Sequence, residues 1–136
     1  MVDPTKDEEL QLRVAYLFRL WEDIRWVYRA LPKPEKVGPM NLRWVEHPPT
    51  RGIIPRLITR AAMQEISAQE RAWIIQGLTA WSGAFEQLVV IASLPRDARP
   101  TELYSGATQS LIECAEQLRK AVTGLRRDMR MKRRRH

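Results

Sequence analysis

Few side chains in this sequence are of the types that perform chemistry. The only thiol is Cys114, and the only histidines are His47 and His136. A catalytic nucleophile needs an activating base within reach. Cys114 instead falls between Leu111 and Leu118 on an apolar helical spacing, where a small buried side chain is the ordinary expectation. We therefore predict no catalytic residue and no enzyme activity.

Metal and cofactor sites are not indicated either. The two histidines and the single cysteine match neither Cys-x-x-Cys nor His-x-x-x-His spacing. Glu113 and Glu116 share a helix face, but no Glu-x-x-His pair accompanies them, so a charged surface is the favoured interpretation. The chain also lacks the glycine-rich loops that hold nucleotide phosphates. We expect no metal, no cofactor and no small-molecule substrate.

Basic charge is the feature with functional content. The chain has 23 Lys and Arg residues against 16 Asp and Glu, a formal charge of +7. The excess lies in residues 32–60, with six basic and two acidic residues, and in residues 126–136, with seven basic and one acidic. Such segments bind polyanions, above all nucleic acid. The alternative is that residues 126–136 only solubilise a helix end, where cations suit the negative pole of the dipole.

The two basic segments supply the candidate nucleic-acid contacts. We expect Trp44, next to Arg43 in a segment without helical period, to stand on a binding surface, where it stacks on an unpaired base or fills a pocket of a partner protein. The alternative is that Trp44 folds back onto the protein core. No zinc-finger, ribonucleoprotein or Gly-x-x-Gly motif is present, so binding is predicted to be independent of sequence. The candidates are Arg43, Trp44, Arg51, Arg56, Arg126, Arg127, Arg130, Lys132, Arg133, Arg134 and Arg135.

Three aromatic residues outside the predicted core indicate protein contacts. Phe18, Trp26 and Trp73 lie off the apolar spacing of their segments, and aromatic rings near arginines are typical of interface hot spots. Other parts of the same chain are the alternative cover for these rings. A second functional hypothesis follows. The protein is then a protein-binding helical bundle, a homo-oligomeric adaptor or an inhibitor of another protein, with an incidental basic tail.

The positions of apolar residues predict an all-α fold. Residues 10–31, 74–92 and 104–129 repeat apolar side chains at alternating spacings of four and three, which is typical of helices packed along one seam. Residues 53–66 form a shorter amphipathic segment, and Ser67 and Glu70 frame a capping box that marks a helix start or a bend. Residues 32–52 contain five prolines. They predict an irregular connection, either an ordered crossover or a binding segment.

The expected architecture is an antiparallel bundle of three long helices of similar length plus one short helix, with the proline-rich connection after the first. We assign residues 1–125 to one bundle domain and residues 126–136 to a basic C-terminal tail, because 136 residues supply a single core. No apolar run approaches the roughly 20 residues of a membrane span.

Two further features bear on cellular location. The acidic N-terminus is unlike a signal peptide, and one cysteine fits a reducing compartment, so we expect a cytoplasmic protein. The favoured function is that of a small non-enzymatic protein that binds nucleic acid through backbone charge, as an accessory subunit of a larger nucleoprotein assembly.

Overall fold

The computed structural model describes residues 6–134 of the chain, so Arg135 and His136 lie outside the described residues. Four α-helices make up most of this range: α1 (Lys6–Ala30), α2 (Ile53–Ala62), α3 (Ala68–Ser93) and α4 (Thr101–Arg134). Three short 3-10 helices lie between them: η1 (Leu42–Val45), η2 (Pro49–Arg51) and η3 (Arg96–Ala98). Three helices are long and one is short, which confirms the predicted fold class.

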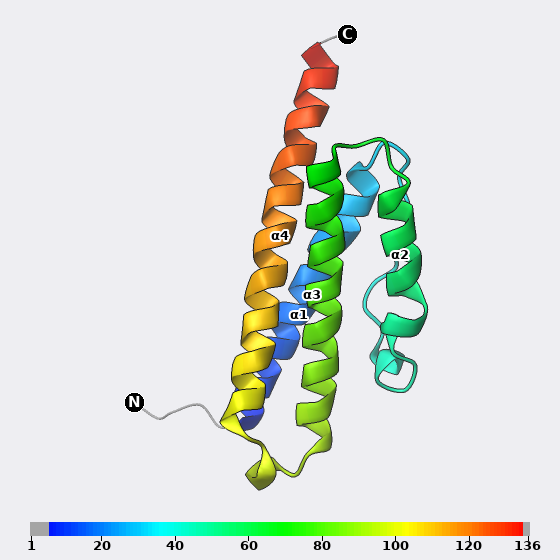
Figure 1. The fold of residues 1–136 in the computed structure, drawn as a ribbon. Helices are drawn as coiled ribbons and strands as arrows, with labels where there is room; N and C mark the ends of the chain where they lie inside the picture. Colours follow the sequence, from blue (N-terminus) through cyan, green and yellow to red (C-terminus); the bar gives the residue numbers. More distant parts are fainter. Residues whose placement is uncertain (1–5, 135–136) are drawn as a thin grey trace.

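The three long helices pack as a bundle in which α3 runs antiparallel to both α1 and α4 (Figure 1). The predicted seams form the core, because each turns one apolar stripe toward the other two. Gly77 shows how closely α3 and α4 approach, since a Cβ atom added there would lie 3.0 Å from Leu118 Cδ2. Ala92 and Met129, at the ends of the predicted spacing, are exposed. Buried seam residues are Leu17, Trp21, Ile24, Tyr28, Leu31, Ile74, Leu78, Trp81, Phe85, Leu88, Tyr104, Leu111, Leu118 and Leu125.

The capping box at Ser67 starts a new helix. Ser67 Oγ accepts a hydrogen bond from the Glu70 backbone N at 3.0 Å and donates one to Glu70 Oε1 at 2.8 Å. The first of these bonds satisfies a backbone donor that the start of α3 would otherwise leave unpaired. The preceding helix α2 stops at Ala62, four residues before the predicted end, and residues 63–66 form the turn into α3.

The proline-rich connection is an ordered crossover. It runs back along the bundle, so α1 and α2 point in the same direction (Figure 1). Trp21 Nε1 donates to the Gly38 carbonyl at 2.8 Å, and Arg25 Nε donates to the Val37 carbonyl at 2.9 Å. These bonds tie the connection to the side of α1, where its backbone carbonyls find buried partners.

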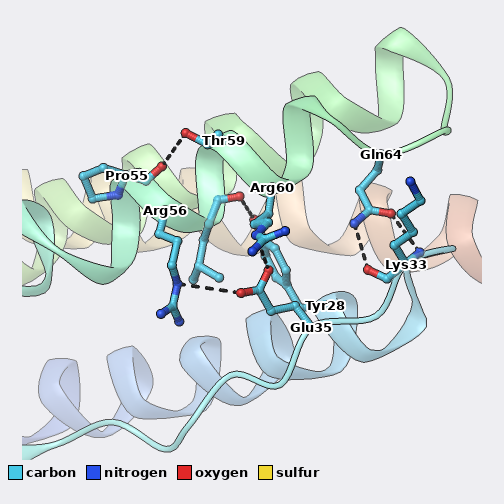
Figure 2. A network of polar contacts seen from close by, with 9 residues as sticks. Tyr28, Lys33, Glu35, Pro55, Arg56, Thr59, Arg60 and Gln64 are labelled. Carbon is cyan, nitrogen blue, oxygen red and sulfur yellow. Dashed lines mark hydrogen bonds and ion pairs between the residues drawn. The ribbon is translucent and has the colours of Figure 1, made fainter.

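A second set of polar contacts holds α2 against the end of α1 (Figure 2). The Tyr28 hydroxyl donates to the Leu57 carbonyl inside the core. Gln64 is buried and pairs with the Lys33 backbone in both directions: Nε2 donates to the carbonyl at 2.8 Å, and Oε1 accepts from the amide at 3.0 Å. The start of the connection is therefore pinned to the end of α2.

Helix α4 is longer than expected and extends past the rest of the bundle (Figure 1). It has 34 residues, against 25 in α1 and 26 in α3. At 1.5 Å per residue, α4 is about 51 Å long and α1 about 38 Å. The helix continues without a break past Leu125, because Arg, Lys and Met favour helix and cations suit its C-terminal end.

Helix α3 is also notable for its apolar character. By length and composition it would be able to cross a bilayer. In the structure some of its apolar side chains, among them Ile74, Trp81 and Ile91, are buried between the other helices, whereas Val90 is exposed. The core helix of a soluble protein has the same length and apolar composition as a membrane span of this kind. The absence of a membrane span therefore stays a prediction.

Candidate nucleic-acid interface

Basic side chains gather on the face of α4 that points away from the core. This basic face follows from the helical period of 100° per residue, which places its members opposite the buried seam of Leu111, Leu118 and Leu125. From residue 119 to residue 134 it extends about 22 Å along the helix axis. The basic face consists of Arg119, Lys120, Arg126, Arg127, Arg130, Arg133 and Arg134.

Two members of this face, Arg119 and Lys120, are absent from the candidates taken from the sequence. They precede the boundary set at residue 125, in a stretch whose net charge is near neutral because Glu113 and Glu116 are interspersed. The helical period of the segment could have identified them, because it places Arg119 and Lys120 on the same helix face as the arginines after residue 125. Charge counted along the chain averages over all faces of a helix, whereas a ligand meets only one.

The arginines of the basic face form no ion pair in the part of the chain that the structure describes, and the only attraction to a nearby carboxylate is that between Arg127 and Asp128. None of them has a carboxylate oxygen within 4.0 Å; Lys120 alone forms an ion pair, 3.5 Å from Glu116. Five arginines elsewhere in the described residues form ion pairs, as Arg25 does with Glu22 at 2.8 Å. Other paired arginines are Arg56, Arg60, Arg96 and Arg99.

A tryptophan flanks the basic face on each side. Toward α1, the Arg126 guanidinium lies 5.2 Å from the centre of the Trp26 ring, a cation–π contact that covers part of that ring. Toward α3, half-buried Trp73 lines an open cleft of about 260 Å³. The rest of that cleft is Arg119, Lys120, Thr123, Gly124 and Arg127, all from α4.

Lys132 lies apart from the basic face. The helical period turns it toward the seam side of α4, beyond the end of the bundle, where it lines a cleft of about 530 Å³ with Leu31, Asp128 and Met129. Asp128 makes this end of α4 less basic than the exposed face. Burial raises the pKa of the Asp128 carboxyl, and its contact with Glu70 raises it further.

Of the basic segment 32–60, Pro32 lies beside the end of α4, in the cleft with Asp128 and Lys132, but the candidate Arg51 lies elsewhere. Arg51 belongs to η2, which precedes α2 at the end of that helix away from the projecting part of α4 (Figure 1). Arg43 and Arg51 are exposed, whereas Arg56 lies 3.7 Å from Glu35, which also binds Arg60 at 3.2 Å (Figure 2). The connection therefore presents scattered charges, and the end of α4 presents an ordered row.

Trp44 does not stand on a surface, so that prediction is wrong. The side chain is only 8% exposed, and its ring centre lies 4.9 Å from that of Trp21 and 5.9 Å from that of Trp81, nearly perpendicular to both. Residues 42–45 form η1, capped by Asn41, whose side chain accepts from the Arg43 amide at 2.9 Å. This short helix turns Trp44 inward because its ring completes the apolar cluster between α1 and α3.

Phe18 borders a different kind of surface, an apolar groove of about 270 Å³ between α1, α3 and the connection. Nearly all of its lining is aliphatic or aromatic, and Val45 at its edge is 63% exposed. An apolar groove of this composition suits the side chain of a partner protein better than a charged ligand. The lining residues are Val14, Leu17, Phe18, Met40, Asn41, Val45, Phe85, Leu88, Val89, Ala92 and Ser93.

The chemically reactive groups are isolated from one another. Cys114 is fully buried, and burial, followed by the charges of Asp23 and Glu113, raises its pKa to about 12. His47 is exposed on the connection. Among residues 6–134, no group of three or more histidine, cysteine and acidic side chains is placed to hold a metal ion. The expectation of a protein without enzyme activity or cofactor remains a prediction.

Fold and site together define an all-helical bundle with one long helix whose basic face projects into solvent. Comparisons with protein-family models, with curated proteins and with solved structures give no match to this chain. Its function is therefore argued from its own residues.

Proposed function

We propose that this protein binds nucleic acid through the phosphate backbone, without sequence specificity, and that the basic face of α4 is its contact surface. One observation carries the proposal: the arginines of that face are exposed, aligned and form no ion pair within 4.0 Å among the described residues. A guanidinium group forms paired, charge-assisted hydrogen bonds with phosphate oxygens. A small accessory subunit of a larger nucleoprotein assembly is the role that this surface suits.

The shape of the interface fits an extended polyanion. Duplex DNA carries one negative charge per roughly 1.7 Å of its axis, so the row of about 22 Å on α4 faces on the order of ten phosphate charges. Because α4 extends beyond its neighbours, a nucleic acid is able to approach the row without meeting the rest of the bundle (Figure 1). Arginine on a single helix supplies charge and position but few means of reading bases.

Salt dependence of binding tests this proposal. We would measure the affinity of the wild-type protein for mixed-sequence DNA and RNA over a series of salt concentrations. The measurement is repeated with Arg130→Gln/Arg134→Gln, which removes two charges from the basic face. The matched control is Arg43→Gln/Arg51→Gln, which removes the same charge from the connection.

Two lost phosphate contacts should reduce the slope of log K against log salt by about 1.4 for single strands and about 1.8 for duplex DNA. We expect this reduction for the α4 pair and a much smaller one for the connection pair. Equal losses for both pairs would show that binding follows net charge and not the basic face. Tight binding that persists at high salt, or no binding by the wild-type protein, would remove the proposal.

The apolar groove at Phe18 favours a second candidate function, that of a protein-binding bundle. Its cavity of about 270 Å³ has almost no polar lining, and protein partners fill such cavities with aliphatic or aromatic side chains. Under this alternative the protein acts as a homo-oligomeric adaptor or as an inhibitor of another protein. Sedimentation at low and high salt separates the two functions, because an apolar interface persists when phosphate contacts are screened.

A further inference from the structure

The cleft between α3 and α4 combines an aromatic ring with positive charge. Trp73 lies on the α3 side, half-buried, and Arg119, Lys120 and Arg127 line the α4 side. No acidic side chain contributes to the lining. Gly124 lets α4 approach the start of α3, because a Cβ atom added there would lie 3.2 Å from Glu70 Oε2, behind the cleft.

This combination suits one chemical class of ligand, an unpaired nucleobase with its adjoining phosphates. The flat indole offers a stacking surface for a base of any identity. The guanidinium groups of Arg119 and Arg127 line the same cleft and can bind the adjoining phosphates. A base within a duplex is already stacked on its neighbours, and extracting it has an energetic cost. The cleft is therefore of use only to a strand whose bases are free.

We infer that the Trp73 cleft binds a base of single-stranded nucleic acid, so that the basic face of α4 prefers single strands over duplexes. This inference rests on the proposed function and specifies its ligand. Trp26, on the other flank of α4, is the natural comparison. Its ring lies under Arg126 at 5.2 Å, so the protein's own cation occupies the position that a stacked base would need.

Trp73→Leu tests the inference, because leucine keeps the apolar contact with the core but has no stacking surface. Stacking on an aromatic side chain corresponds to a roughly 5- to 150-fold change in affinity per base. The probes are a fluorescein-labelled 20-nucleotide oligothymidylate, an oligouridylate of the same length and a 20-base-pair duplex, followed by anisotropy. We expect Trp73→Leu to lower the affinity for both single strands by roughly 5- to 150-fold and to change the affinity for the duplex by less than about twofold.

Two further variants accompany this measurement. Trp73→Phe retains a ring and should restore most of the single-strand affinity, whereas Trp26→Leu should leave the preference for single strands unchanged. Thermal melts verify that each variant is folded. If Trp73→Leu is not stable, Thr123→Leu replaces it, since this exposed, charge-neutral change narrows the same cleft and should cause the same selective loss.

The outcomes distinguish the inference from the function on which it rests. Unchanged single-strand affinity in Trp73→Leu, or equal losses for single strands and duplex, would overturn the role of the cleft. If Arg130→Gln/Arg134→Gln still weakens binding in that case, the proposed function stands without it. A wild-type protein that binds none of the three probes would remove both.

Discussion

Replacing Trp44 with alanine should destabilise the protein strongly. A tryptophan side chain buries about 150 to 250 Å², and Trp44 is only 8% exposed. At about 25 cal/mol per Å², some 200 Å² corresponds to about 5 kcal/mol, and residual burial in the denatured chain reduces this by about 10 to 40%. The expected loss is about 3 to 5 kcal/mol, the usual range for tryptophan replaced by alanine.

The location of the ring places the loss in the upper part of that range. Trp44 contacts Trp21 and Trp81 edge to face, at 4.9 and 5.9 Å between ring centres. Such pairs contribute about 0.5 to 1.5 kcal/mol beyond their buried area. In a chain of this length, about 4 kcal/mol lowers the melting temperature by roughly 10 to 15 °C.

Urea unfolding followed by circular dichroism measures this effect, with Val45→Ala as the control. Val45 is the next residue in the chain and is 63% exposed, so its truncation should change the free energy of unfolding by less than about 0.5 kcal/mol. Because 3 to 5 kcal/mol is a large part of a typical domain's stability of about 5 to 15, Trp44→Phe provides a milder change of the same kind.

A loss below about 1 kcal/mol for Trp44→Ala would refute the assignment of Trp44 to the core. Titration with nucleic acid gives the complementary result. Because Trp44 is only 8% exposed, the folded variant should keep the wild-type affinity within about twofold, well short of the effect of losing one stacked base. Intact stability with weakened binding would restore Trp44 as a surface contact.

Three further predictions use the raised pKa values of Cys114 and Asp128. With its pKa near 12, the Cys114 thiol is almost entirely protonated at pH 8. Alkylation by iodoacetamide should therefore be about a thousandfold slower in the native protein than in the urea-unfolded protein. Native and unfolded rates within about tenfold of each other would contradict the burial of Cys114. The same shift means that stability declines as pH rises above about 9, where the unfolded thiol ionises. The Asp128 pKa is raised by burial and by Glu70, so ionised Asp128 lowers the stability of the folded protein at pH 7. Asp128→Asn should therefore raise the free energy of unfolding at pH 7 by roughly 0.5 kcal/mol, a small value because solvent screens the interaction between the two carboxylates. That gain should shrink in melts at pH 4, and a variant less stable than wild type at pH 7 would show that the carboxylate is favourably held.

The sequence determined the helices of this protein because their signals are local. Apolar spacing of four and three sets the buried stripe of each long helix, and the hydroxyl of Ser67 caps a backbone amide only three residues away. The basic C-terminal end was evident in the same way, from consecutive charges. The irregular character of residues 32–52 followed from their prolines, since proline donates no backbone hydrogen bond.

Only the tertiary structure decided which way the irregular segment turns its side chains. A helix or strand has a period that relates sequence position to face, and residues 32–52 have none. Trp44 enters the core because Trp21 and Trp81, which are 60 residues apart in the chain, lie next to each other across α1 and α3. The ion pair between Arg56 and Glu35 likewise forms only because the connection runs back past α2.

The proposed interface depends on both kinds of information. Charge along the sequence identified the end of α4, but the length of its free portion follows from where the other helices stop. Trp73 and Arg119 are far apart in the chain, and they line one cleft only because α3 and α4 pack antiparallel with a particular rotation about their axes. That rotation results from core packing along the whole contact between the two helices, including the close approach at Gly77, and no short stretch of sequence encodes it.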